Sequence, residues 1–209
     1  MGKSIWPASD PTGELLQGAR DGNSQATNDL FDRHRSALRR LVQMRLDRRV
    51  QQRVDVSDVV QDVLTEASTR LTDYLANPSM SFHLWLRQIA WDHMIDTYRR
   101  HRGSAKRSMD REQSIVGPVA DDRSTMEMIV QLQDPELTPA AAAIQSEMTK
   151  RVEATIDQLD ANDHEIILMR HFEYLSNQEV AEVLGLQPAA ASMRYLRAVR
   201  RLRELLDNL

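Results

Sequence analysis

Arginine side chains gather on a helix predicted from Pro188 onward, which has no acidic residue before Glu204. These arginines are Arg194, Arg197, Arg200, Arg201 and Arg203. A helix that is basic along most of its length can neutralise phosphates and can also place guanidinium groups against base edges. The residue type and its spacing therefore predict a contact with nucleic acid.

A helix-turn-helix is predicted around this basic helix. Ser176 followed three residues later by Glu179 has the pattern of a capping box, which fixes the start of the first helix. Gly185 can adopt the positive φ that ends that helix, and Pro188 suits the first turn of the next one. Ala181 is small where the two helices must cross. We therefore expect the second helix to be presented to duplex DNA.

A second candidate surface lies on a helix predicted over residues 55–76, with Asp55 as its cap. Its apolar stripe consists of Val56, Val59, Val60, Val63, Leu64, Ala67, Leu71, Tyr74 and Leu75. Because a helix has about 3.6 residues per turn, the polar residues between these positions share the opposite face. They are Asp58, Gln61, Asp62 and Glu66. On its own, such a face is more often a solvated surface than a binding site.

Aromatic and basic residues lie close together between residues 82 and 102. Two helices are predicted here, over residues 82–89 and roughly 92–101, with Trp85 on the apolar side of the first. Trp91 falls at the junction between them, where it could be exposed. An exposed aromatic ring beside Arg99 and Arg100 can hold single-stranded DNA by stacking and phosphate neutralisation.

Composition limits the possible functions. The chain has 209 residues, 41% of them hydrophobic, no cysteine and a formal net charge of -4. Disulfides and cysteine-ligated zinc are therefore excluded, and nucleic-acid binding requires segregated basic residues. Residues 33–53 and 99–111 are basic, whereas residues 55–73 and 112–165 are acidic. No apolar run could span a bilayer and no signal-peptide core is present, so we expect a soluble, cytoplasmic protein without membrane insertion.

The expected fold is all-α. Further helices are predicted over residues 24–47 with Ser24 as cap, over 138–159 beginning at Thr138-Pro139, and over 161–172. Patterns typical of strands are nearly absent. We divide the chain into an N-terminal tail (1–11), a first helical domain (12–102), an acidic linker (103–137) and a second helical domain (138–209).

Enzymatic motifs are not found in the sequence. None of the six histidines lies four residues from another, Gly2-Lys3-Ser4 lacks the upstream glycine of a phosphate loop, and Gly-x-Ser-x-Gly is absent. We therefore expect no catalytic, cofactor-binding or metal-binding residue, and no cofactor.

The order of the segments resembles that of extracytoplasmic-function (ECF) sigma factors, in the sigma-70 family of bacterial RNA polymerase. The resemblance rests on residues 55–67, 82–90 and 96–102, followed by the helix-turn-helix. It implies that the first domain is sigma region two, which binds core polymerase and opens the minus-10 element. It also implies that the second domain is region four, which binds the minus-35 element, and that the linker lies in a basic polymerase channel.

The resemblance also implies roles for individual residues. The residues that match the core polymerase contact are Asp58, Gln61 and Asp62. Those implied for minus-10 DNA are Trp91, Asp92, His93, Asp96, Arg99 and Arg100. Those implied for minus-35 DNA are Ala189, Ala190, Ser192, Met193, Arg194, Arg197, Arg200 and Arg201.

The sequence departs from the family pattern at two places. Asp92 stands where Asn is common, and an acid there accepts from a base amine but repels phosphate. Residues 189–191 are all Ala where Gly-Thr-Val is common. We expect Ala191 to pack inward, Arg194 or Arg197 to read a base, and Arg200 and Arg201 to contact phosphate.

One alternative stays open at this point. A two-domain helix-turn-helix regulator would bind duplex DNA without being a polymerase subunit, and its dimer would prefer palindromic sites. A sigma factor would instead bind core polymerase tightly, and an anti-sigma factor is a further possible partner.

Overall fold

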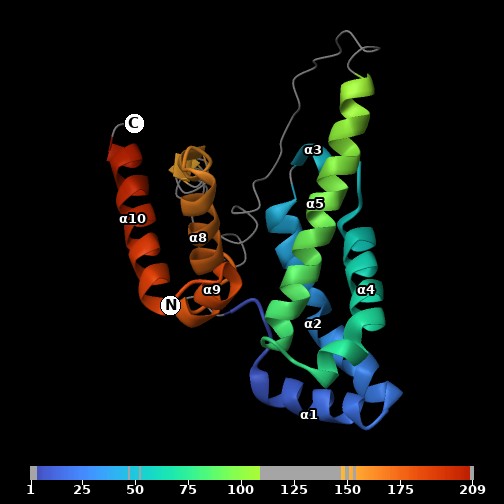
Figure 1. Cartoon of the computed structure of the whole chain (residues 1–209). Helices are drawn as coiled ribbons and strands as arrows, with labels where there is room; N and C mark the ends of the chain where they lie inside the picture. The colour runs from blue at the N-terminus through green and yellow to red at the C-terminus, as the bar shows by residue number, and fades with distance from the viewer. Residues whose placement is uncertain are drawn as a thin grey trace, which may run out of the picture. The chain divides into compact units, whose positions relative to one another are not determined.

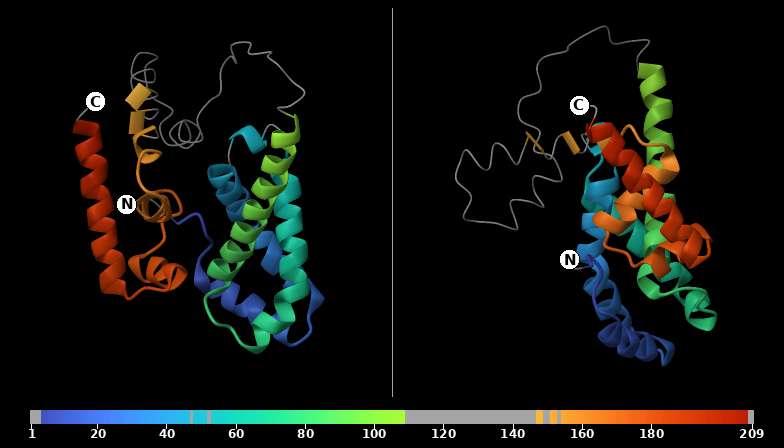
Figure 2. Two further views of the ribbon diagram at one scale, coloured as in Figure 1. Left: turned by 45° about the horizontal axis from the view of Figure 1, so that its top comes forward. Right: turned by 90° about the vertical axis from the view of Figure 1, so that its left-hand side faces the viewer.

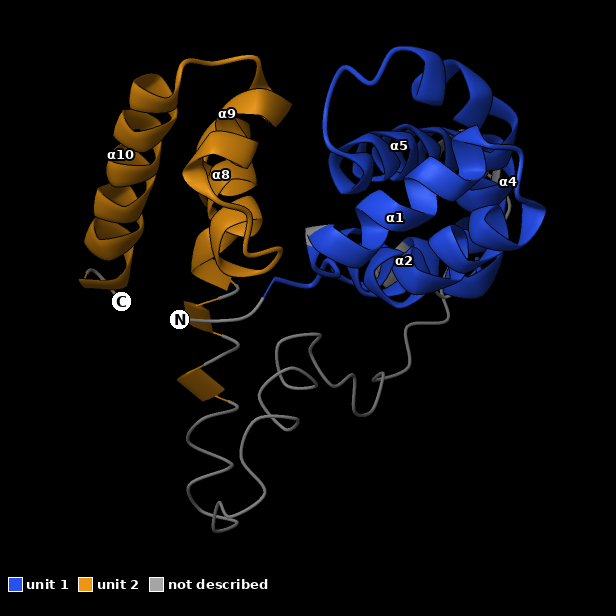
Figure 3. Ribbon diagram, turned by 90° about the horizontal axis from the view of Figure 1, so that it is seen from below, with its two compact units in different colours: residues 1, 3–115 blue, residues 2, 116–209 orange. Residues whose placement is uncertain are grey.

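The computed structural model describes residues 4–46, 48–51, 53–108, 147–148, 151–152 and 154–207. Within these residues every regular element is a helix, which confirms the predicted all-α fold (Figure 1). The chain forms two compact units, drawn in blue and orange in Figure 3. The described part of the N-terminal unit ends at Ser108, and that of the C-terminal unit begins at Glu147. None of the described helices is long and apolar enough to cross a membrane.

The N-terminal unit is built from α1 (Ser9–Arg20), α2 (Ser24–Arg45), α3 (Arg48–Gln51), α4 (Val56–Ala76) and α5 (Phe82–Ser108). Helices α2, α4 and α5 pack against one another, and α1 crosses one end of this group (Figures 1 and 2). The innermost side chains are Leu30, Leu38, Leu41, Val42, Val63, Ala67, Leu84, Leu86, Ile89 and Ala90. Each large aliphatic side chain buried in this way contributes roughly 1.5–3 kcal/mol.

The start of the chain differs from the sequence expectation of a tail over residues 1–11. Trp6 is buried, with its ring centroid 5.7 Å from that of His83. Helix α1 begins at Ser9. Gly18 allows this helix to lie close to α2, because a Cβ atom there would come within 2.7 Å of the Ala26 Cβ. Helix α1 has few apolar residues, so its sequence showed no strong helical periodicity. Its position against α2 depends on the close packing of Gly18 on Ala26.

Helix caps agree with the sequence prediction at two of three positions in this unit. The Asp55 side chain accepts from the Ser57 amide at 2.7 Å, and α4 ends before Asn77. The prediction of Ser24 as a cap is wrong by one residue, since Asn23 accepts from the amides of Gln25 and Ala26. Either residue type can cap a helix, so composition alone did not separate them.

Helix α5 corrects the prediction of two helices between residues 82 and 101. It is continuous from Phe82 to Ser108, so Trp91 lies within a helix and not at a junction. No glycine or proline interrupts residues 82–102, and a single glycine at 103 costs only about 0.5–1 kcal/mol in a helix. Residues 103–108 of the predicted linker are therefore helical, and its residues 109–137 lie outside the described residues.

The C-terminal unit contains α8 (Ala161–His171), α9 (Asn177–Leu184) and α10 (Pro188–Asp207). Its buried residues include Ile156, Ile166, Ile167, Met169, Leu175 and Val180. The predicted starts at Ala161 and Pro188 are confirmed, and the Asp160 side chain caps α8. Residues 154–156 are helical within the helix predicted over 138–159, whereas Thr138-Pro139 lies outside the described residues.

Candidate protein and nucleic-acid interfaces

The outward face of α4 carries the acidic residues predicted for it. Asp58, Gln61 and Asp62 are exposed, and Val59 and Val63 on the opposite side are buried. The hydrogen bond from the Ser57 amide lowers the pKa of the Asp55 carboxyl. The start of this helix is therefore capped by an anion, and its two acids Asp58 and Asp62 lie exposed on a well-defined helix face.

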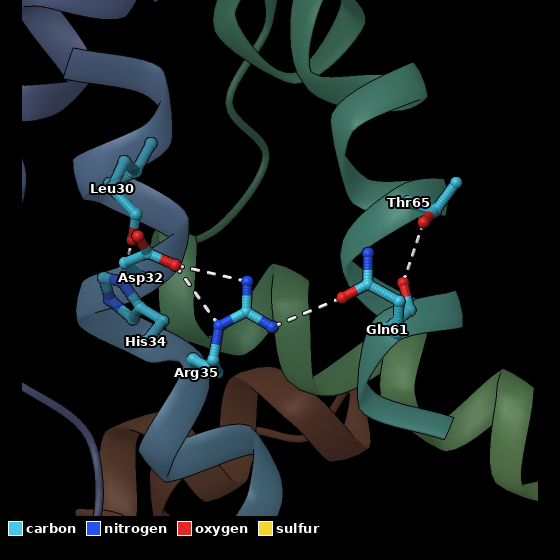
Figure 4. Close-up of polar contacts among 6 residues, drawn as sticks. All are labelled: Leu30, Asp32, His34, Arg35, Gln61 and Thr65. Carbon is cyan, nitrogen blue, oxygen red and sulfur yellow. Dashed lines mark hydrogen bonds and ion pairs between the residues drawn. The ribbon is translucent and has the colours of Figure 1, made fainter. Parts of the chain in front are cut away.

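Gln61 is tied to the neighbouring helix α2, a contact that the sequence analysis did not predict. Figure 4 shows the Arg35 guanidinium between Asp32 of its own helix and Gln61 of α4. Arg35 donates to Gln61 Oε1 at 3.3 Å and pairs with Asp32 Oδ1 at 3.2 Å. These contacts extend the polar surface of α4 onto α2. The sequence showed Arg35 only as one member of a basic segment.

Glu66 joins α4 to α5. Its carboxylate pairs with Arg70 one turn later and with Nε2 of His93 on α5. The His93 side chain is only 20% exposed as a result. His93 therefore lies between the acidic face of α4 and the remaining candidate residues of α5.

Four candidate residues of α5 are exposed and share one helix face: Asp92, Asp96, Arg99 and Arg100. Arg99 pairs with Asp96 at 3.7 Å, and Arg100 Nε donates to the Asp96 backbone oxygen at 3.3 Å. The two acids precede the two arginines along this face. It is therefore less positive than the predicted basic cluster suggests, and it is suited to polar contacts with bases as well as to phosphates.

Trp91 has a different environment from the one expected. Its ring is half-buried, with the Arg45 guanidinium carbon 5.3 Å and the Arg87 guanidinium carbon 5.8 Å from the ring centroid. Arg45 comes from α2, and Arg87 is buried within α5. Trp91 thus makes cation–π contacts with these two arginines inside the N-terminal unit.

The helix-turn-helix has the predicted local geometry. Glu179 N donates to Ser176 Oγ at 3.2 Å and Ser176 N donates to Glu179 Oε2 at 2.6 Å, which completes the capping box. Gly185 has φ 62° and Ala181 is buried. The sequence analysis missed Asn177, whose side chain donates to the Pro188 backbone oxygen at 2.9 Å. This bond fixes the start of α10 relative to the start of α9.

Helix α10 divides its candidate residues between surface and interior. Ala191 is buried, as predicted, and so is Ala198. Ser192 and Arg194 are half-buried. The exposed candidates are Ala189, Ala190, Met193, Arg197, Arg200 and Arg201. The outer surface of the helix thus begins with short side chains and continues with arginines, an arrangement that fits a groove.

Three further contacts hold α10 on α8. His171 Nε2 lies 2.9 Å from the Tyr195 hydroxyl, and the Arg170 guanidinium is 5.5 Å from the Tyr195 ring centroid. Burial lowers the pKa of His171. Arg197 Nε lies 3.9 Å from Asp163 Oδ1, and burial raises the pKa of this Asp163 carboxyl. No local sequence signal relates Asp163 to Arg197.

No group of three or more histidine, aspartate or glutamate side chains suited to a metal ion occurs among the described residues. The exposed candidate residues on α4 and α5 are charged or polar, and those on α10 are alanine, methionine and arginine.

Comparison with known proteins gives concordant matches over nearly the whole chain. The sequence pattern of the family described as ECF sigma factor matches residues 10–206. The RNA polymerase sigma factor CnrH of Cupriavidus metallidurans is 32% identical over 198 residues, which cover 92% of this chain and 93% of the relative. The ECF RNA polymerase sigma-E factor of Haemophilus influenzae is 25% identical over 194 residues, which cover 93% and 92%.

A solved structure extends the likeness to the fold. In the structure of CnrH in complex with the cytosolic domain of CnrY, the matched chain is 26% identical and superposes with a TM-score of 0.58. The match covers 95% of this chain and 99% of that chain. The similarity therefore includes both helical units.

Proposed function

Because this chain belongs to the ECF sigma factor family and directs RNA polymerase to promoters, we propose that its two units bind different parts of the initiation complex. The N-terminal unit binds core polymerase through α4 and the minus-10 element through α5. The C-terminal unit binds the minus-35 element through α10. The observation that carries this proposal is the basic, exposed surface of α10 in a helix-turn-helix whose first helix is capped at both ends.

The polymerase contact is assigned to Asp58, Gln61 and Asp62. Their exposure on the face opposite the packed valines supports this assignment, since no core packing requires acids there. Arg35 holds the amide of Gln61 from α2 and so restricts its rotamers before binding. A surface with fewer side-chain rotations to lose binds at a smaller entropic cost.

The minus-10 contact is assigned to the face of α5. Asp92, Asp96, Arg99 and Arg100 meet the DNA directly, which their exposure supports. Trp91 and His93 are partly accessible and contribute their outer edges, while their inner sides contact the N-terminal unit. Asp92 accepts from a base amine in the opened strand.

The minus-35 contact is assigned to the exposed side of α10. Ala189 and Ala190 let the start of the helix approach the bases, and Ser192 and Met193 follow in the next turn. Arg194 and Arg197 reach a base edge or a nearby phosphate. Arg200 and Arg201 lie further along the helix and contact the phosphate backbone.

We further infer that the chain works in the cytoplasm and is not itself an enzyme, in keeping with a family whose members are sigma factors. Its partners are bacterial core RNA polymerase and promoter DNA. The relative CnrH was solved with the cytosolic domain of CnrY, and we propose that a regulatory protein also covers this chain when it is inactive.

Transcription with purified bacterial core polymerase tests the proposal. With a library of promoter fragments as template, added protein is expected to produce transcripts with defined starts that core polymerase alone does not make. Their upstream sequences should share elements near minus-35 and minus-10. The alternative regulator is not favoured by the family match. Absence of new starts, together with tight binding to palindromic duplexes without polymerase, would establish that alternative instead.

A further inference from the structure

Asp163 is an unusual residue in the C-terminal unit, because it is an acid buried next to the candidate DNA-binding helix. It belongs to the first turn of α8 and only 6% of its side chain is exposed. Its Oδ1 atom is fully buried and has no hydrogen-bond partner among the described residues. A buried carboxylate is unfavourable unless a positive charge offsets the lost hydration.

Arg197 of α10 places a positive charge beside this acid. Its Nε lies 3.9 Å from Asp163 Oδ1, although 68% of the arginine side chain is exposed. Burial and the neighbouring Asp160 raise the pKa of the Asp163 carboxyl, whereas Arg197 and Arg194 act in the opposite direction and favour its charged form. The Arg197 side chain thus runs from a buried acid toward solvent. Its terminal nitrogens carry N–H donors beyond the one on Nε.

This arrangement restricts an arginine that we assign to DNA. A long surface side chain samples many rotamers and loses them on binding, which weakens the complex. An acid that attracts the guanidinium from beneath removes part of this freedom in the free protein. The positive charge of Arg197 offsets that of the buried acid, whereas an unpaired, exposed acid on this surface would repel phosphate.

We propose that Asp163 is a positioning residue for minus-35 recognition, which holds the Arg197 guanidinium in the orientation that meets DNA. This inference rests on the proposed function of α10. It assigns Asp163 no contact with DNA, so its effect on binding passes through Arg197. The Asp163–Arg197 pair thereby links α8 to the DNA contact of α10, although α8 itself carries no residue assigned to DNA.

A double-mutant cycle in the holoenzyme tests the proposal. The probe is a duplex promoter selected by the wild-type holoenzyme from a library randomised at minus-35. Affinity is measured at several salt concentrations for the wild type, Asp163→Asn, Arg197→Ala and the double variant. Asp163→Asn is expected to weaken binding about threefold to tenfold in the wild-type background, as for coupled neighbours, and to have no effect when Arg197 is already Ala.

Asp207→Asn is the matched control. It removes the same charge from an acid that pairs with Arg203 at 3.8 Å on the exposed surface of α10. Thermal unfolding of each variant separates loss of folding from loss of positioning.

Arg197→Lys is a second variant that tests the proposal and leaves Asp163 intact. Lysine keeps the charge but has no guanidinium, so promoter affinity is expected to fall even if Asp163→Asn folds poorly.

Several results would overturn the proposal. An equal loss from Asp163→Asn in both backgrounds would indicate a structural role independent of Arg197. Tighter binding by Asp163→Asn would show that the acid repels phosphate, and wild-type affinity of Asp163→Asn or Arg197→Lys would exclude positioning. If Arg197→Ala were silent as well, the minus-35 assignment of Arg197 would fail together with the inference. If Arg197→Ala weakened binding and Asp163→Asn did not, only the inference would fail.

Discussion

The two units bury opposite kinds of titratable group. In the N-terminal unit His34 packs edge-on against Phe82, with ring centroids 5.0 Å apart, and its Nδ1 lies 2.8 Å from the Leu30 backbone oxygen. Desolvation by burial lowers the pKa of His34 to about 4, and the nearby His83 and Arg33 add to this effect. In the C-terminal unit desolvation raises the pKa of Asp163. Both interiors thus favour the neutral form of the buried group.

The difference has consequences for stability at acid pH. A neutral buried histidine must gain a proton when its unit unfolds in acid, so His34 makes the N-terminal unit less stable as the pH falls. Asp163 has the opposite effect, since its raised pKa means that the folded state binds more protons than the unfolded one. His171 and Asp160 have lowered pKa values and oppose Asp163. The N-terminal unit is therefore expected to be the more acid-sensitive of the two.

The largest expected effect is the pH dependence due to His34. The pKa of His34 is near 6.5 in the unfolded chain and about 4 in the folded unit. The contribution of neutral His34 to the free energy of unfolding is therefore complete above pH 6.5 and is lost as the pH falls toward 4. The loss is about 3 kcal/mol. Tryptophan fluorescence measures it selectively, because Trp6, Trp85 and Trp91 all lie in the N-terminal unit. Urea titrations at several pH values give the free energy of unfolding.

His34→Gln and His83→Gln form the matched pair for this measurement. Glutamine at position 34 can donate to the Leu30 oxygen but does not titrate, so the slope between pH 6.5 and 4 should largely disappear. His83→Gln should retain most of the slope, because burial of His34 is the largest cause of its lowered pKa and His83 only adds to it. A wild-type fluorescence transition that does not shift over this range would contradict the contrast between the two units.

The next largest effect is a loss of affinity for core polymerase with no change in the stability of the protein. Asp58 and Asp62 are exposed on α4, so replacing both with Ala should leave helicity and unfolding unchanged. Affinity for core polymerase should fall by about 2–4 kcal/mol, as for hot-spot residues. A competition assay with labelled wild-type protein measures this loss. Asp73→Ala, which removes an exposed acid near the other end of α4, serves as control. Unchanged affinity of the double variant would remove the assignment.

In the C-terminal unit, binding and stability should change together. Arg197→Ala leaves Asp163 without its nearest cation, so it should destabilise this unit as well as weaken promoter binding. If Arg194 or Arg197 reads a base, its Ala variant should lose about 1–3 kcal/mol on the preferred promoter and relax selectivity at one position. Contact with phosphate alone should reduce affinity on all sequences and lower the salt slope by about one unit.

Arg203→Ala is the control for these variants, because Arg203 is exposed and is not assigned to DNA. A holoenzyme carrying both Arg194→Ala and Arg197→Ala but with unchanged promoter choice and salt slope would show that α10 does not enter the groove. The same variants examined by far-UV circular dichroism report whether the C-terminal unit has lost stability.

Local sequence signals were sufficient for some parts of the molecule. The capping box at Ser176, the positive φ of Gly185 and the start at Pro188 depend on residues close in sequence, and each is confirmed. The exposure of Asp58 and Asp62 followed from the apolar period of α4. Helix α1 was not predicted, because its place depends on packing such as the approach of Gly18 to Ala26. The continuity of α5 was missed although no glycine or proline interrupts residues 82–102.

The connections between candidate surfaces were also beyond local reasoning. Arg35 and Gln61 are 26 residues apart, and Glu66 and His93 are 27 apart. Sequence patterns place each residue on a helix face, but the partner across the interface depends on how the helices cross. The roles of the site residues in binding polymerase and DNA stay predictions.

The smallest expected effect tests whether the two units unfold independently of each other. Ser176→Ala removes the capping box of α9, and Asn23→Ala removes the cap of α2. Each should cost about 1 kcal/mol, which lowers the melting temperature of a domain of 60–100 residues by about 4–8 °C. Only Asn23→Ala should shift the tryptophan fluorescence transition, since the tryptophans lie in its unit. Ser176→Ala should instead shift the part of the far-UV signal that melts without fluorescence change. If Ser176→Ala moved the fluorescence transition by the same amount, the two units would unfold together. His34 and Asp163 would then both contribute to a single free energy of unfolding.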